Sequence, residues 1–176
     1  MRSWFLLAAL LGATPALAEH AVSLGASNLQ IRANYGVYPV RWLADAGYSY
    51  ATERWLFGGG VRLATPKGGA PVPLEVYARA QVTTRVGVWN PALGPELGYS
   101  FLSEVGPRES QLPADILWLE SRYTGPLYIA VHAAPLRFSF QRFSLSVLEV
   151  GLGTPITTPS SMVRLQVGLL NAEVRL

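Results

Sequence analysis

The sequence predicts an all-β protein, an antiparallel up-and-down transmembrane β-barrel of eight strands that follows an export signal. Three observations lead to this fold class. A long stretch in the middle of the chain alternates strictly between apolar and polar residues, the composition is poor in charge, and the first eighteen residues have the features of a secretory signal. Ten strands would also fit the number of strand-like segments.

The alternation is clearest from Leu74 to Trp89, LEVYARAQVTTRVGVW. One set of alternate positions is mostly small and apolar, and the other is charged, polar or aromatic. Successive side chains of a strand point to opposite faces, so a period of two predicts a strand with two unlike faces. Soluble strands usually have about 5–6 residues, whereas a tilted strand that crosses a bilayer needs about 9–11. The stretch fits one long transmembrane strand, or two strands joined by a tight turn near Thr83-Thr84.

The composition points the same way. Half of the residues are hydrophobic, only 14% are charged, and Lys67 is the only lysine. Soluble domains expose many Lys and Glu side chains, because these groups are seldom buried. After the signal there is no apolar helix long enough to span a bilayer, and a closed barrel is the other structure that satisfies every backbone group in lipid. Seventeen glycines and thirteen prolines argue against a helical bundle.

Residues 1–18 are expected to be a signal peptide, and residues 19–176 to be the barrel. Arg2 supplies a positive start, a short apolar core follows, and Ala16-Leu17-Ala18 offers small residues for cleavage. The chain has no cysteine, so it has no disulfide framework and no Cys-linked lipid anchor. Without Arg2 there are thirteen basic and eleven acidic residues, and this small excess gives no support for nucleic-acid binding.

Strand-like segments recur along the rest of the chain. The first changes phase at Ser27-Asn28, which predicts a bulge. The predicted strands cover residues 22–35, 41–52, 55–65, 74–89, 96–105, 116–123, 127–133, 136–140, 143–147 and 162–176. The predicted loops cover residues 66–73, 106–113 and 154–160. Three joints decide the count, at Thr83-Thr84, Ala134-Pro135 and Gln141-Arg142. Single-chain bacterial barrels have even strand numbers, and eight matches this chain length.

These features resemble the small bacterial outer-membrane β-barrel proteins, the group that includes the OmpA-type membrane domain and OmpX. The resemblance rests on the signal peptide, the alternating strands, the amphipathic final strand and aromatic residues near strand ends, at Trp42, Trp55, Tyr99, Phe138 and Phe143. One departure is the last residue, Leu176, where that group usually has an aromatic residue. The resemblance implies an integral protein of the outer membrane, with outer-membrane lipids, lipopolysaccharide and the assembly machinery as partners. The oligomeric state stays open.

Charged residues on the polar faces are expected to meet in the lumen. An eight-stranded barrel is narrow enough to be filled by side chains, and an unpaired charge there is costly. A polar pore or ligand site is one interpretation, and a salt-bridged plug that fixes strand register is the favoured one. The candidates for this network are Glu75, Arg79, Arg85, Glu96, Glu120, Arg122, Glu149 and Arg164.

The favoured function is non-enzymatic, structural or interactive through surface loops, with no catalytic residue, cofactor or metal site. One alternative is a lipid-modifying hydrolase that uses His132 with Glu120 and either Ser139 or Ser144. Outer-membrane lipid A deacylases carry a His-x-Ser-Asn signature, whereas His132 is followed by Ala-Ala-Pro. The other alternative is a soluble periplasmic lipid carrier of the lipocalin type, with its apolar face inward.

Overall fold

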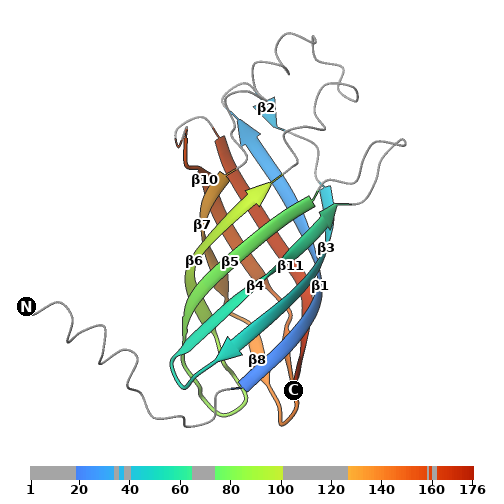
Figure 1. The fold of residues 1–176 in the computed structure, drawn as a ribbon, viewed down its shortest axis with the longest axis vertical. Coiled ribbons are helices and arrows are strands. Elements are labelled where there is room, and N and C mark those ends of the chain that lie inside the picture. Colours follow the sequence, from blue (N-terminus) through green and yellow to red (C-terminus); the bar gives the residue numbers. More distant parts are fainter. Residues whose placement is uncertain are drawn as a thin grey trace, which may run out of the picture.

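The computed structural model describes residues 19–33, 36–37, 41–64, 74–100, 127–157, 159 and 162–176. These residues form a tilted, closed cylinder of antiparallel strands (Figure 1). Among them no helix is long and apolar enough to cross a membrane. The strands are β1 (Glu19–Ala33), β2 (Gly36–Val37), β3 (Arg41–Ala51), β4 (Trp55–Ala64), β5 (Leu74–Thr83), β6 (Ala92–Ser100), β7 (Leu127–Ala134), β8 (Arg137–Ser139), β9 (Phe143–Ser146), β10 (Glu149–Pro155) and β11 (Met162–Arg175).

The eleven segments make an eight-stranded barrel. The wall runs in the order β1, β3, β4, β5, β6, β7, β10 and β11, and β11 pairs with β1 to close it. The three short segments continue neighbouring strands: β2 pairs with β1 ahead of β3, while β8 and β9 extend β7 and β10. The predicted antiparallel up-and-down barrel of eight strands is therefore confirmed.

The chain breaks at or near all three joints, and Gln141-Arg142 closes the hairpin between β8 and β9 as predicted. The strand predicted for residues 74–89 ends at Thr83, and the remaining residues form the turn between β5 and β6, closed by a bridge between Val86 and Trp89. Gly87 has a φ of 64°, a conformation that glycine adopts without strain, so the turn lies there rather than at Thr83-Thr84. Pro135 follows β7 and interrupts the wall before β8, because it cannot donate a ladder bond.

The bulge lies on a different strand from the one predicted. β1 keeps one inward phase throughout, with Ser23, Ser27 and Leu29 all buried. Its register with β11 passes from Ala26↔Leu170 to Ser27↔Gly168, which leaves Leu169 without a partner. The side chains of β1 keep alternating between the two faces without interruption. The apparent phase change in its sequence arises because the inner face carries serine at Ser23 and Ser27 but leucine at Leu29.

The two faces of the wall have opposite chemistry. On β5, Glu75, Tyr77, Arg79 and Gln81 are buried inside, while the side chains between them are more exposed. The other strands of the wall show the same arrangement, with polar side chains buried inside and apolar side chains exposed outside. Arg32 is the one charged side chain on the outer face of the strands whose side chains are described. The soluble-carrier alternative needs an apolar inner face. It is therefore wrong, because the inner face of the wall is mostly polar.

Two clusters of buried apolar side chains lie in the interior, one near each end. Leu29, Leu43 and Ala64 form a buried cluster near the end where β1 and β4 finish. Leu56, Ala92 and Ala134 form another near the opposite end, where β4 and β6 begin. The charged residues around Arg62 and Glu149 lie between these clusters, whereas Arg137 lies on β8, beyond Ala134.

Some predicted elements lie outside the described residues, namely the signal peptide at 1–18, the loop at 66–73, residues 101–105, the loop at 106–113 and the strand at 116–123. β10, in contrast, was not predicted. Gly151 and Gly153 obscure its alternation, and a Cβ on Gly153 would come within 2.7 Å of the Ala130 side chain on β7.

Close packing across β6 and β7 predicts that an added methyl group is tolerated at one inward glycine and not at another. Gly98 pairs with Tyr128, whose ring covers the place that a Cβ at residue 98 would occupy. Gly98→Ala should lower the free energy of unfolding by about 1–3 kcal/mol, because the ring must move. Gly151→Ala is the control, since its Cβ would meet nothing nearer than 3.5 Å. Urea unfolding followed by tryptophan fluorescence measures both, and equal midpoints would contradict the packing.

Candidate functional site in the barrel lumen

Arg62 is the centre of the first group of charges in the lumen. Asp45, Arg62 and Glu75 are direct partners on three neighbouring strands, β3, β4 and β5. The Arg62 Nε donates to an Asp45 oxygen at 2.7 Å, and its two terminal nitrogens donate to the carboxylate of Glu96 at 2.7 and 2.8 Å. Arg62 is 1% exposed, so these bonds replace its hydration.

The same group extends across the lumen to β11. Glu75 is fully buried and lies 3.6 Å from Arg62, and it also accepts from Arg164 of β11. Tyr128 donates to Glu96 at 3.1 Å, and its ring stacks under the Arg164 guanidinium at 3.8 Å. Strands from opposite sides of the barrel are thus joined by alternating positive and negative groups, which is the arrangement that buried charges need.

A second group surrounds Glu149 on β10. Its carboxylate lies 3.6 Å from Arg79 of β5 and 3.4 Å from the Nε2 atom of His132 on β7, and it accepts from Asn171 at 3.0 Å. The amide nitrogen of Gln81 lies 3.1 Å from the Nδ1 atom of His132. An amide NH₂ only donates, so Nδ1 accepts and Nε2 is left to donate to Glu149.

A third group lies nearer the end with the β8–β9 turn. Arg137 donates to Glu173 at 2.6 Å, and the hydroxyl groups of Ser139 and Ser144 lie 3.0 Å apart. All four side chains are buried. These contacts join β8 and β9 to each other and to β11.

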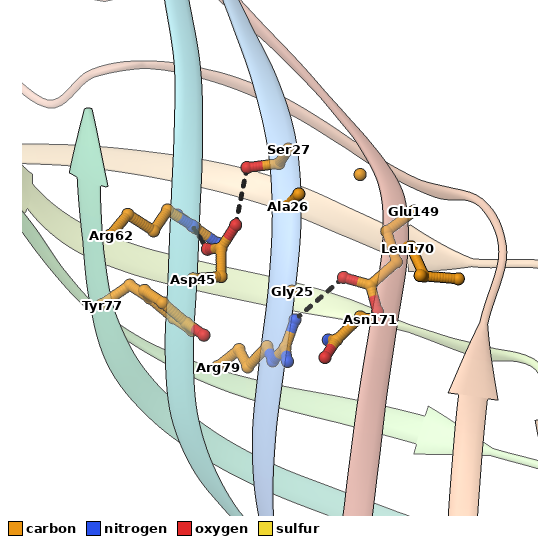
Figure 2. Close-up of a pocket in the computed structure, with 11 residues that line it drawn as sticks. Gly25, Ala26, Ser27, Asp45, Arg62, Tyr77, Arg79, Glu149, Leu170 and Asn171 are labelled. Atoms are coloured by element: carbon orange, nitrogen blue, oxygen red, sulfur yellow. Dashed lines mark hydrogen bonds and ion pairs between the residues drawn. The ribbon is translucent and has the colours of Figure 1, made fainter. Parts of the chain in front are cut away.

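Little free space remains between the first two groups. Figure 2 shows Arg62, Asp45 and Ser27 on one side of the gap and Arg79 with Glu149 on the other, beside Asn171. The gap holds about one water molecule. At this place in the lumen the side chains thus leave very little room, which agrees with the narrow bore expected of an eight-stranded barrel.

The structure brings five of the eight candidate residues into these groups: Glu75, Arg79, Glu96, Glu149 and Arg164. Arg85 lies outside, and its inclusion was wrong. It is exposed in the β5–β6 turn, and its Nε donates to the Gly87 carbonyl at 3.3 Å, because β5 ends two residues earlier. Glu120 and Arg122 lie outside the described residues.

Four charged members of the network were missing from the candidates: Asp45, Arg62, Arg137 and Glu173. The signal was present in the sequence. Asp45 and Arg62 both stand on the less apolar set of their alternating strands, as Glu75 does. Applying the alternation rule to every strand, and not mainly to residues 74–89, would have found these two.

Among the described residues, those proposed for the hydrolase alternative are not arranged as a catalytic triad. Both ring nitrogens of His132 face Gln81 and Glu149, while Ser139 and Ser144 bond to each other. The serine and histidine of such a triad must be in hydrogen-bond contact. No group of three potential metal ligands of the His, Cys, Asp and Glu types occurs in the same described ranges.

Fold and site together define a small, closed, eight-stranded antiparallel barrel with paired charged residues buried inside and apolar side chains outside. No protein-family model and no curated protein sequence matches the chain. Among solved structures, the chain is similar to Neisserial surface protein A (NspA), with a TM-score of 0.57 and 11% identity over 89% of this chain and 97% of that one. It also matches Ail, the attachment invasion locus protein of Yersinia pestis, in complex with the heparin analogue sucrose octasulfate. There the TM-score is 0.44 and the identity 14%, over 90% of this chain and 99% of that one. The likeness to NspA shows a shared fold.

The pairing around Arg62 predicts a large and specific loss of stability. Arg62→Met keeps the length of the side chain but leaves the buried Glu96 and the partly buried Asp45 without the guanidinium that they bind. It should lower the free energy of unfolding by about 3–5 kcal/mol. Arg85→Met is the matched control, because Arg85 is exposed, and it should change stability by less than about 0.5 kcal/mol. Denaturant titration of both variants tests this, and similar midpoints would show that Arg62 contributes no more than a surface charge.

Proposed function

We propose that this chain is an integral barrel protein of the outer membrane, exported through residues 1–18, with a structural or surface-interaction role and no catalytic activity. The observation that carries the proposal is the reversal of polarity between the two faces of the wall. Charges lie inside and are paired, and aliphatic and aromatic side chains lie outside, including Leu24, Leu93, Val131 and Leu152. Water would not stabilise such an exterior, whereas hydrocarbon does.

Strand length supports the same proposal. β3, β4, β5 and β6 have 11, 10, 10 and 9 residues. A tilted strand needs about 9–11 residues to cross the hydrocarbon layer. The pairing of β1 with β11 leaves no open edge, which a barrel in lipid requires because lipid offers no hydrogen bonds to free backbone groups.

Exposed aromatic side chains lie near both ends of the wall. Trp42 and Tyr99 are near one end, and Trp55 and Phe143 are near the other. Aromatic rings of this kind sit at the two membrane–water interfaces of outer-membrane barrels, where one edge of the ring meets lipid and the other meets water.

The connections suggest which end faces the cell surface. Residues 52–54, 84–91 and 140–142 join strands at one end, where β1 starts and β11 finishes (Figure 1). At the other end the connections include residues 65–73 and 101–126. Outer-membrane barrels have short periplasmic turns and longer external loops. We therefore assign the interactive role to the longer connections, which would meet lipopolysaccharide and external partners.

The lumen network would act as a plug that fixes the strand register. A slip of one residue would turn each charged side chain of a strand toward the outside. The penalty for an unpaired charge then favours the observed pairing over its neighbours. A filled interior of this kind is not a route for solutes.

Fractionation tests the proposal directly. The full chain, expressed in a Gram-negative host, should be recovered with the outer membrane and released only by detergent. An unboiled sample should migrate differently from a boiled one on a denaturing gel, because the closed barrel resists detergent until heated. Recovery in the soluble fraction without detergent, together with identical migration, would sink the membrane assignment.

The outer face gives an independent test of the lipid contact. Leu97 lies in the middle of β6 and points outward. Leu97→Arg should lower the free energy of unfolding in vesicles by about 2–4 kcal/mol, the cost measured for arginine near the bilayer midplane. Leu97→Met is the control and should cost less than about 1.5 kcal/mol. Equal stabilities of the two variants would contradict a hydrocarbon environment at this position.

A further inference from the structure

The end of the barrel with the short turns carries an arginine in each of its three turns. Arg54 lies between β3 and β4, Arg85 between β5 and β6, and Arg142 between β8 and β9. All three side chains are exposed, and none forms an ion pair with another described residue. We call these three residues the arginine rim.

The backbone holds two members of the arginine rim in place. The Arg54 carbonyl accepts from the Thr83 amide at 2.9 Å, and the Arg142 carbonyl accepts from the Arg175 amide at 2.9 Å. The turns therefore dock onto the neighbouring strand ends, and their side chains project from a fixed edge. The fold does not need these charges, because neither of these two guanidinium groups makes a side-chain hydrogen bond to the described residues.

Aromatic side chains on the outer face accompany each arginine. Trp55 follows Arg54 and stacks on Phe57 with ring centroids 6.0 Å apart, and Phe143 follows Arg142 and stacks on Phe140 at 4.9 Å. In the remaining turn, Trp89 is bridged to Val86, next to Arg85. A cation beside an exposed aromatic ring, at the edge of an apolar wall, fits the level of lipid headgroups.

The charge is also uneven between the two ends. The three turns hold three arginines against one carboxylate, Glu53, whereas residues 65–73 and 101–126 hold three basic and four acidic residues. A lipid surface attracts basic groups when its headgroups are anionic, by roughly a factor of five for each arginine or lysine near the surface. The positive charge of the arginine rim therefore favours anionic over zwitterionic headgroups.

We propose that the arginine rim binds the phosphate groups of anionic phospholipids, such as phosphatidylglycerol, in the leaflet on the short-turn side. This inference rests on the proposed membrane function and names the lipid class that the barrel prefers there. The arginines pair with phosphate oxygens, and the adjacent aromatic rings lie at the acyl–headgroup boundary. The rim thereby fixes the depth of the barrel in that leaflet.

The experiment uses the native tryptophans as reporters. The full chain is reconstituted in phosphatidylcholine vesicles that contain either brominated phosphatidylcholine or brominated phosphatidylglycerol, whose bromine atoms quench tryptophan on contact. Competition between the two lipids gives their relative affinity for the barrel surface. The wild type should prefer phosphatidylglycerol by about threefold or more at low salt, and 0.5 M NaCl should weaken that preference.

Variants assign the preference to the rim. Arg54→Gln/Arg85→Gln/Arg142→Gln should abolish it while retaining quenching by both lipids. Arg32→Gln is the matched control, because Arg32 is exposed on the outer face of β1 near the opposite end, and it should keep the preference. Equal quenching of the wild type by the two lipids, or a preference that survives the triple substitution, overturns the inference. Absence of quenching by either lipid overturns the proposed membrane function itself.

Discussion

Closure of the wall between β1 and β11 is the constraint on which the other features depend. Pairing along these two strands removes the edges and divides all strand side chains into an outer and an inner set. The inner set is confined to a cylinder too narrow for bulk water, so each charge within it must find a partner of opposite sign. Arg62 meets this demand with carboxylates from β3, β5 and β6, and Arg164 meets it across the lumen from β11.

The interior is layered along its axis. The groups around Arg62 and Glu149 occupy the middle, while Leu29, Leu43 and Ala64 lie toward one end and Leu56, Ala92 and Ala134 toward the other. This layering explains why the inner face of β1 carries serine at Ser23 and Ser27 but leucine at Leu29, near the end of the strand. The plug that we propose would leave the ends of the barrel, and not its lumen, for other molecules.

The two ends then differ in what they offer. One end has short turns that are fixed to strand ends by backbone hydrogen bonds, with arginines beside outward aromatic rings. The other has the longer connections, with acidic residues slightly in excess. In the membrane setting that we propose, these unlike ends would orient the molecule in a layer whose two leaflets differ in headgroup chemistry.

The sequence by itself determined the barrel, because a two-residue period in an apolar, charge-poor chain leaves few other ways to satisfy the backbone. The period also assigned Glu75 and Arg79 to the inner face. Only the tertiary structure decided which charges meet. Arg85 follows the same period, yet Gly87 reverses the chain and leaves Arg85 outside. The bulge lies at Leu169 on β11, and the sequence of β1 could not show this, because register depends on two paired strands together. β10 was missed because Gly151 and Gly153 have no side chains to alternate, and at Gly153 the neighbouring strand β7 leaves no room for one. Alternation is local and can be read along one strand, whereas partners are chosen by strands far apart in the chain.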